Sequence, residues 1–207
     1  MIRTKNRGTN AALAASFSSF FFAPMLHAGT VLELSDRSSD ETPASFLSAS
    51  FHFSVSGDLL TLGVFNQTEA PFEFNLSEIF FNGASPVDDL NLLTAPPGWS
   101  FLLNQRADGF GRFDFALIGE HGTNAAIIEP DDSAVFTFDI LGDGPFTDAS
   151  FTTAMSSIPP GSTSVVAAAK FVNGPGDDSA FGALVPEPVT GILVWSGWMA
   201  VLARKRN

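Results

Sequence analysis

Acidic side chains are the most numerous candidates for chemistry in this chain, which holds 22 Asp and Glu residues among 207. Asp131 and Asp132 follow a proline, and other aspartates stand among turn-forming residues at positions 88, 89, 143, 177 and 178. Oxygen-rich loops of this kind can bind calcium. However, no Asp-x-Asp-x-Asp-Gly loop is present, and aspartate is favoured in turns for backbone reasons alone. Calcium binding therefore stands as an alternative to plain turn chemistry, and the sequence indicates no other cofactor or metal site.

Histidine, serine and cysteine form no catalytic constellation in the sequence. His52 lies in an alternating stretch and His121 in a turn, and two histidines cannot form a three-histidine zinc site. No Gly-x-Ser-x-Gly sequence, which would place an activated serine on a strained turn, occurs after the first 28 residues. The absence of cysteine excludes disulfides, thiol nucleophiles and cysteine-ligated zinc. We therefore predict no catalytic residues and no enzymatic activity. A secreted hydrolase is the third-ranked function for this chain, after a structural or adhesive role and a carbohydrate- or calcium-binding module.

Trp99 is the one tryptophan between the two ends of the chain, and it follows the sequence Ala-Pro-Pro-Gly. An exposed ring beside such a turn could stack on a sugar, and Trp99 is thus a candidate ligand-binding residue beside Asp131 and Asp132. A large aromatic residue at the start of a strand is more often buried in the core. Burial is the expectation for Trp99, and a carbohydrate-binding surface is the alternative.

Alternation of apolar and polar residues predicts the elements that would hold these side chains. Phe51, Phe53 and Val55 alternate with polar residues, and the chain then turns at Gly57-Asp58 and alternates again. Further strands are predicted over residues 30–34, 72–76, 79–82, 100–104, 113–117, 136–140, 149–154 and 164–172. Such strands hide their single apolar faces by pairing two sheets. We predict an all-β fold, an antiparallel β-sandwich with jelly-roll or immunoglobulin-like strand order.

The strand pattern occupies residues 29–172, a length that suffices for one hydrophobic core. Residues 173–184, Asn-Gly-Pro-Gly-Asp-Asp-Ser-Ala-Phe-Gly-Ala-Leu, are rich in turn-forming and small residues and indicate a flexible linker. The predicted order is a signal peptide (1–28), a sandwich domain (29–172), a linker (173–184) and a C-terminal tail (185–207).

Charge is divided sharply along the chain. Three of the ten basic residues lie among the first seven and three among the last four, whereas all acidic residues lie between Glu33 and Glu187. The segment between the two basic clusters holds four basic and 22 acidic residues, a net charge of −18. Such a surface repels nucleic acid and anionic lipid, so we predict no nucleic-acid partner.

The N-terminus has the three parts of a secretion signal. Three basic residues precede an uncharged run over residues 11–23, which is too short to span a bilayer as a helix. Pro24 ends the run, and Ala28 is the small residue that precedes a cleavage site. We predict a signal helix in a peptide that is cleaved between Ala28 and Gly29.

The C-terminus has the parts of a membrane-anchored tail. In order, they are Pro186-Glu187-Pro188, an uncharged run over residues 189–203, and the basic cluster Arg204, Lys205 and Arg206. Pro188 stands where a helix can begin, and Glu187 lies beside the positive end of that helix. The run therefore predicts a transmembrane helix over 189–203. The basic cluster stops it on the cytoplasmic side, so that the acidic segment lies outside.

This three-part order resembles the PEP-CTERM sorting signal, and the resemblance is confined to residues 185–207. It implies recognition by exosortase, a membrane cysteine protease or transpeptidase, and removal of the tail near the Pro-Glu-Pro sequence. It also implies a Gram-negative envelope and frequent association with exopolysaccharide or biofilm matrix. The chain departs from the pattern in Val189-Thr190, where a Ser or Thr often follows directly, and in its short basic cluster. The resemblance concerns sorting and implies almost nothing about the domain.

These features predict an exported envelope or extracellular-matrix protein with a non-enzymatic structural or adhesive sandwich. The body would first stand in the periplasm, held by the tail in the inner membrane, and would then reach the cell surface or the exterior. Expected partners are an exosortase-type enzyme, the inner membrane and, through the resemblance, exopolysaccharide. A carbohydrate- or calcium-binding module is the alternative.

Overall fold

The computed structural model describes residues 29–35, 37–39, 44–120, 126–158, 163–176 and 178–184. The predicted signal peptide up to Ala28 and the predicted tail, with its helix over 189–203, lie outside these ranges. Within them, no helix combines the length and the apolar character needed to cross a membrane.

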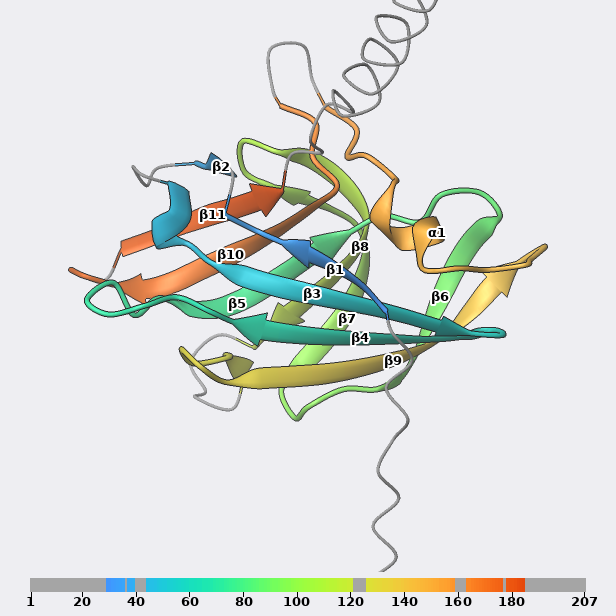
Figure 1. Cartoon of the computed structure of the whole chain (residues 1–207), viewed down its shortest axis with the longest axis horizontal. Coiled ribbons are helices and arrows are strands. Elements are labelled where there is room, and N and C mark those ends of the chain that lie inside the picture. Colours follow the sequence, from blue (N-terminus) through green and yellow to red (C-terminus); the bar gives the residue numbers. More distant parts are fainter. Residues whose placement is uncertain are drawn as a thin grey trace, which may run out of the picture.

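Antiparallel strands form two sheets (Figure 1). The five-stranded sheet contains, in spatial order, β1 (Thr30–Glu33), β3 (Ala49–Ser56), β4 (Leu59–Asn66), β9 (Ser133–Gly142) and β6 (Val87–Thr94). The six-stranded sheet contains β2 (Arg37–Ser38), β11 (Asp178–Leu184), β10 (Ala167–Gly174), β5 (Asn75–Phe81), β8 (Gly111–Gly119) and β7 (Trp99–Ala107). A 3-10 helix, η1 (Ala44–Phe46), and a one-turn helix, α1 (Ala149–Thr152), complete the elements described. The predicted all-β, antiparallel fold is confirmed.

Phenylalanine rings fill the space between the two sheets. Phe81 of β5 lies at the centre, with its ring centroid 5.7 Å from that of Phe53 in β3 and 6.0 Å from that of Phe138 in β9. Phe115 of β8 lies 5.4 Å away on the same sheet as Phe81. All four rings are buried. The alternation that predicted these strands thus arises because every second side chain enters one shared core.

The six-stranded sheet also buries side chains on its outer face. Phe80 and Phe113 lie there, each 1% exposed, beside buried alanines of β10 and β11. Lys170 and Glu78 form an ion pair on this face, with Nζ 2.9 Å from Oε1. Burial on both faces explains why parts of β5 and β10 are continuous apolar runs rather than alternating ones.

The predicted linker over residues 173–184 is wrong, because most of it is a strand. Asp178–Leu184 is β11, which pairs along β10, and residues 173 and 174 still belong to β10. Its small residues are what the packing requires: a Cβ on Gly182 would stand 3.0 Å from the ring of Phe171. The Gly and Pro residues before β11 form a hairpin turn rather than a linker. The domain therefore extends through Leu184.

The sequence pattern does not predict β6 (Val87–Thr94), and two predicted strands differ from the structure. Residues 149–152 form α1 instead of a strand, and its Phe151 is buried with its ring 6.1 Å from that of Phe53. Asp148, just before α1, accepts a hydrogen bond from the backbone N–H of Val55 at 2.8 Å. This bond ties α1 to β3. The buried ring of Phe151 accounts for the apolar residue in the sequence pattern that predicts a strand here. The strand predicted over residues 72–76 is the second one that differs. There, β5 begins only at Asn75, and Phe72 lies in the preceding turn.

A buried asparagine ties the loops at one end of the sandwich together. The side-chain amide of Asn66 donates to the carbonyl oxygens of Phe74, at 2.8 Å, and Ile128, at 2.9 Å. Its Oδ1 accepts from the backbone N–H of Thr68 at 3.1 Å. Asn66 is fully buried, and we call this arrangement the Asn66 clamp. It joins the end of β4 to the segment before β5 and to the segment before β9.

Candidate functional site

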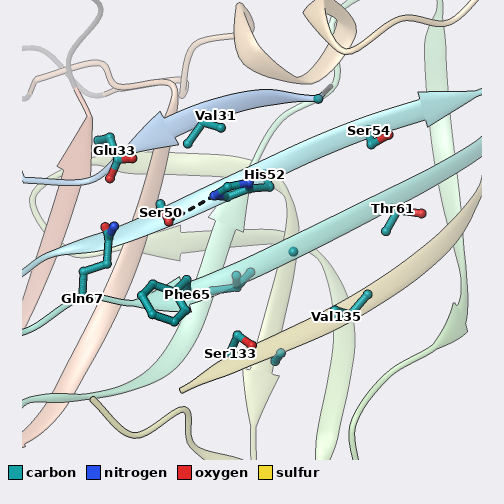
Figure 2. A pocket seen from close by; sticks show the side chains of 14 residues that line it. Val31, Glu33, Ser50, His52, Ser54, Thr61, Phe65, Gln67, Ser133 and Val135 are labelled. Atoms are coloured by element: carbon teal, nitrogen blue, oxygen red, sulfur yellow. Dashed lines mark hydrogen bonds between the residues drawn. The ribbon is translucent and has the colours of Figure 1, made fainter. Parts of the chain in front are cut away.

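A hollow of about 760 Å³ lies on the outer face of the five-stranded sheet, the face turned away from the core. It crosses β1, β3, β4 and β9, and Figure 2 shows its side chains spread over these strands. The side chains are those of Val31, Glu33, Ser50, His52, Ser54, Thr61, Phe65, Gln67, Ser133 and Val135. We call this feature the outer hollow.

The pairing of the strands explains how the outer hollow forms around Gly63. Alternate residues of β4 are buried in the core, so Thr61, Gly63 and Phe65 face outward. Gly63 pairs with His52 of β3 on one side and with Val135 of β9 on the other. Because Gly63 has no side chain, nothing rises from the central strand between these two neighbours. Gly63 therefore forms the floor.

The wall of the outer hollow combines apolar and hydroxyl groups. Val31 and Val135 are 42% and 55% exposed, and Phe65 is half-buried beside them. Ser133 stands beside Phe65, and Thr61 lies across from Ser54 on the other side of Gly63 (Figure 2). Apolar side chains can cover the carbon faces of a ligand while hydroxyls bind its polar groups. The arrangement suits a neutral molecule that carries many polar groups.

A serine and a histidine meet in the outer hollow, with Ser50 Oγ 3.3 Å from His52 Nε2. A catalytic pair of this type needs an accessible serine and an acidic residue that orients the histidine. Ser50 is only 2% exposed. Glu33 pairs with Ser50 in the β1–β3 register, and no hydrogen bond joins it to His52 in the described part of the chain. The geometry is that of a structural hydrogen bond between neighbouring outward residues of β3.

Gln67 connects the outer hollow with a second, smaller one. The smaller hollow, of about 390 Å³, is lined by Phe46 and Phe72, whose rings stack with centroids 3.7 Å apart. Gln67 lines both hollows, and its Oε1 atom is buried without a hydrogen-bond partner among the described residues. A buried acceptor without a partner is unfavourable.

Trp99 lies in the core and presents no stacking surface. It is 8% exposed, and its ring packs edge-on against that of Phe136 with centroids 5.4 Å apart. The expected burial of this ring is what the structure shows, and the alternative of an exposed sugar platform at Trp99 is wrong. The physical reason is that Trp99 is the first residue of β7 and faces the opposite sheet. A carbohydrate site on this chain has to lie elsewhere.

Asp131 and Asp132 form a tight turn before β9. Asp131 has a φ of 65°, and its backbone N–H donates to the carbonyl oxygen of Asn66 at 2.9 Å. The backbone N–H of Asp132 donates to the carbonyl oxygen of Glu129 at 3.0 Å. Within the described ranges, no three His, Asp or Glu side chains gather where they could hold a metal ion. Both aspartates thus take part in the turn through their backbone N–H groups.

The predicted sorting and cleavage residues fall at the edge of the described chain or beyond it. Pro186, Glu187, Pro188 and the basic cluster at positions 204–206 lie outside the described residues, as does Ala28. Gly29 is described and lines the outer hollow at its β1 side. A Cβ at Gly29 would collide with the carbonyl oxygen of Phe53, so the close approach requires glycine.

Comparison of the chain with known protein families, characterised proteins and solved structures finds no match.

Proposed function

We propose that this chain is an exported envelope or extracellular-matrix protein with a non-enzymatic, structural or adhesive body. The observation that carries the proposal is the division of charge: basic residues at both ends and a net charge of −18 between them. Basic residues stay on the cytoplasmic side of a membrane, so this division places the acidic segment outside. The Pro186-Glu187-Pro188 tail adds a sorting sequence that resembles an exosortase substrate.

The sequence of events follows from the two ends. The signal peptide takes the chain through the inner membrane and is removed before Gly29. The tail helix over 189–203 then holds the body in the periplasm until an exosortase-type enzyme cuts or transfers it near Pro186. The body then reaches the cell surface or the exterior. The end of β11 at Leu184 supports this order, because cleavage beyond it leaves every described strand intact.

We further infer an immunoglobulin-like strand order for the body. The order β3-β4-β9-β6 corresponds to strands A, B, E and D of such domains, and β11-β10-β5 corresponds to G, F and C. The hairpin of β7 and β8 extends the second sheet. Extracellular sandwiches of this kind commonly serve as structural or adhesive units, which suits the proposed function.

A carbohydrate-binding module is the second candidate, and the outer hollow favours it. For this candidate function, the carbohydrate site lies on the outer face of the five-stranded sheet and not at Trp99. A hydrolase has less support, because Ser50 is buried and its hydrogen bond to His52 lacks an orienting carboxylate among the described residues.

Replacing Pro186, Glu187 and Pro188 with alanine tests the sorting proposal. The variant should keep its tail and stay in the membrane fraction, because the enzyme can no longer recognise the junction. Cell fractionation and immunoblotting measure both the location and the apparent mass. The matched control replaces a Glu-Pro pair of the body, the exposed Glu129 and the half-buried Pro130, and should be sorted like the wild type. Normal release of the tail variant would contradict the proposal.

A further inference from the structure

The outer face of the five-stranded sheet carries much of the exposed apolar surface of the described chain. Five of the nine exposed large apolar side chains lie on it, in four of its strands: Val31, Leu59, Leu93, Val135 and Leu141. Val31 and Val135 line the outer hollow, whereas Leu59, Leu93 and Leu141 stand elsewhere on the same face. Single exposed apolar residues are ordinary, so the two valines of the hollow are the ones that bear on ligand binding.

The charge of the outer hollow limits what can bind there. Among the described residues, Glu33 is the only acidic one that lines it, and it stands at the end of β1. The chain around it carries a net charge of −18, which repels anionic polymers and also repels a second copy of the same chain. A cationic ligand would find few carboxylates in the hollow. The complementary ligand is an uncharged one.

The packing of the fold does not require a glycine at position 63, at the floor of the outer hollow. Glycine inside a strand weakens the strand, and it often marks a place where a ligand approaches the backbone. A Cβ on Gly63 would meet only the Cβ of His52, at 3.6 Å, which is an ordinary contact. At Gly174, by contrast, a Cβ would collide with the ring of Phe74. Packing explains the second glycine but not the first.

The polar groups of the outer hollow suit hydroxyls. Thr61, Ser133 and His52 can each donate or accept a hydrogen bond, and a sugar hydroxyl does the same. Val31, Phe65 and Val135 can lie against the carbon faces of a sugar ring. Neutral, hydroxyl-rich and partly apolar chemistry is that of an uncharged polysaccharide.

We propose that the outer hollow binds an uncharged polysaccharide chain, with Gly63 as the floor on which the sugar rings rest. This inference rests on the proposed function, because it names the partner that the exported body would meet. It also excludes acidic polysaccharides as the partner, which the proposed function alone does not.

Gly63→Thr tests this inference, because the threonine side chain fills the floor and also favours the strand. The full chain is purified in mild detergent from cells that export it. Its migration is measured in native gels that contain either the neutral or the uronic-acid fraction of the polysaccharide secreted by those cells. We expect the neutral fraction alone to retard the wild type. We expect Gly63→Thr to bind at least tenfold more weakly, with a melting temperature equal to or above that of the wild type.

The matched control is Asn91→Thr, which places the same side chain on β6 of the same sheet, outside the outer hollow. It should bind like the wild type. Equal binding by Gly63→Thr, retardation only by the uronic-acid fraction, or no retardation at all would overturn the inference. A dimer in sedimentation that Gly63→Thr dissociates would also overturn it and would identify a second copy as the occupant.

The location of the wild-type chain is measured in the same cells. A chain that reaches the cell surface without binding the neutral fraction contradicts the inference alone. A chain that stays in the cytosol with its first 28 residues contradicts the proposed function.

Discussion

Asn66→Ala is expected to lower the free energy of unfolding by about 3–5 kcal/mol, because three buried hydrogen bonds are lost at once. The carbonyl oxygen of Phe74 and the backbone N–H of Thr68 lose the partner that Asn66 provides, and the carbonyl oxygen of Ile128 keeps only the backbone N–H of Leu76. Asn66 is fully buried, so water cannot replace the lost bonds without opening the end of the sandwich. The loss of the clamp should therefore loosen the segments before β5 and β9 together.

Urea unfolding followed by fluorescence or circular dichroism measures this effect. Asn91→Ala is the matched control, since Asn91 is exposed on β6, and the change there should be within about 0.5 kcal/mol. Equal stability of the two variants would show that the clamp contributes nothing. Native-state hydrogen exchange adds a local readout, since Thr68 should lose protection in Asn66→Ala.

Asn66→Asp tests the Asn66 clamp through the pH dependence of folding stability. The introduced carboxylate would face the carbonyl oxygens of Phe74 and Ile128, so the folded state favours the protonated form and raises the pKa of that carboxyl above its unfolded value. The folded state then holds more protons than the unfolded state. Stability relative to the wild type should therefore fall as the pH rises from about 4 to about 7, through and above the unfolded pKa.

Ending the chain at Val172 is expected to abolish cooperative folding, whereas ending it at Leu184 should leave a folded body. The shorter chain lacks β11, whose Ala180 and Ala183 are buried on the two faces of the six-stranded sheet. It also leaves β10 unpaired on one side. A domain is stable by only about 5–15 kcal/mol in total, which the loss of a paired strand can exhaust.

Thermal circular dichroism and limited proteolysis of the two truncated chains measure the difference. The chain ending at Leu184 is the matched control, because it lacks only residues outside the described fold. A cooperative transition at the same temperature in both chains would show that β11 is dispensable. It would also restore the linker that the sequence predicts over residues 173–184.

Alternation predicts most of the strands that bury one face, but not β6 (Val87–Thr94). Phe51, Phe53 and Leu62 alternate with polar residues because the outer neighbours face solvent, and that pattern is local. β11 escaped prediction because Gly182 and the alanines beside it pack by being small. Small residues carry the same composition signal in a linker and in a closely packed strand. The contact between Gly182 and the ring of Phe171 on β10, which identifies a closely packed strand, is a tertiary contact that the composition does not show.

The site was less predictable than the fold. The outer hollow joins His52, Gly63 and Val135, which stand on three strands and become neighbours only through the register. The one local signal was Gly63, a glycine inside an otherwise regular alternation of β4. Trp99 was a candidate because of its residue type. The direction of its side chain, however, depends on packing against the opposite sheet, and the sequence around Trp99 does not encode that contact.

Intact-mass spectrometry of the chain recovered from the surface of the cells that make it tests the central proposal most directly. The account predicts a mature protein that begins at Gly29 and lacks the apolar helix and basic cluster beyond Pro186-Glu187-Pro188. Cells without the sorting enzyme should yield a heavier, membrane-held form that retains residues 189–207. Recovery of the unprocessed chain, Met1 to Asn207, from the cytosol would contradict the account.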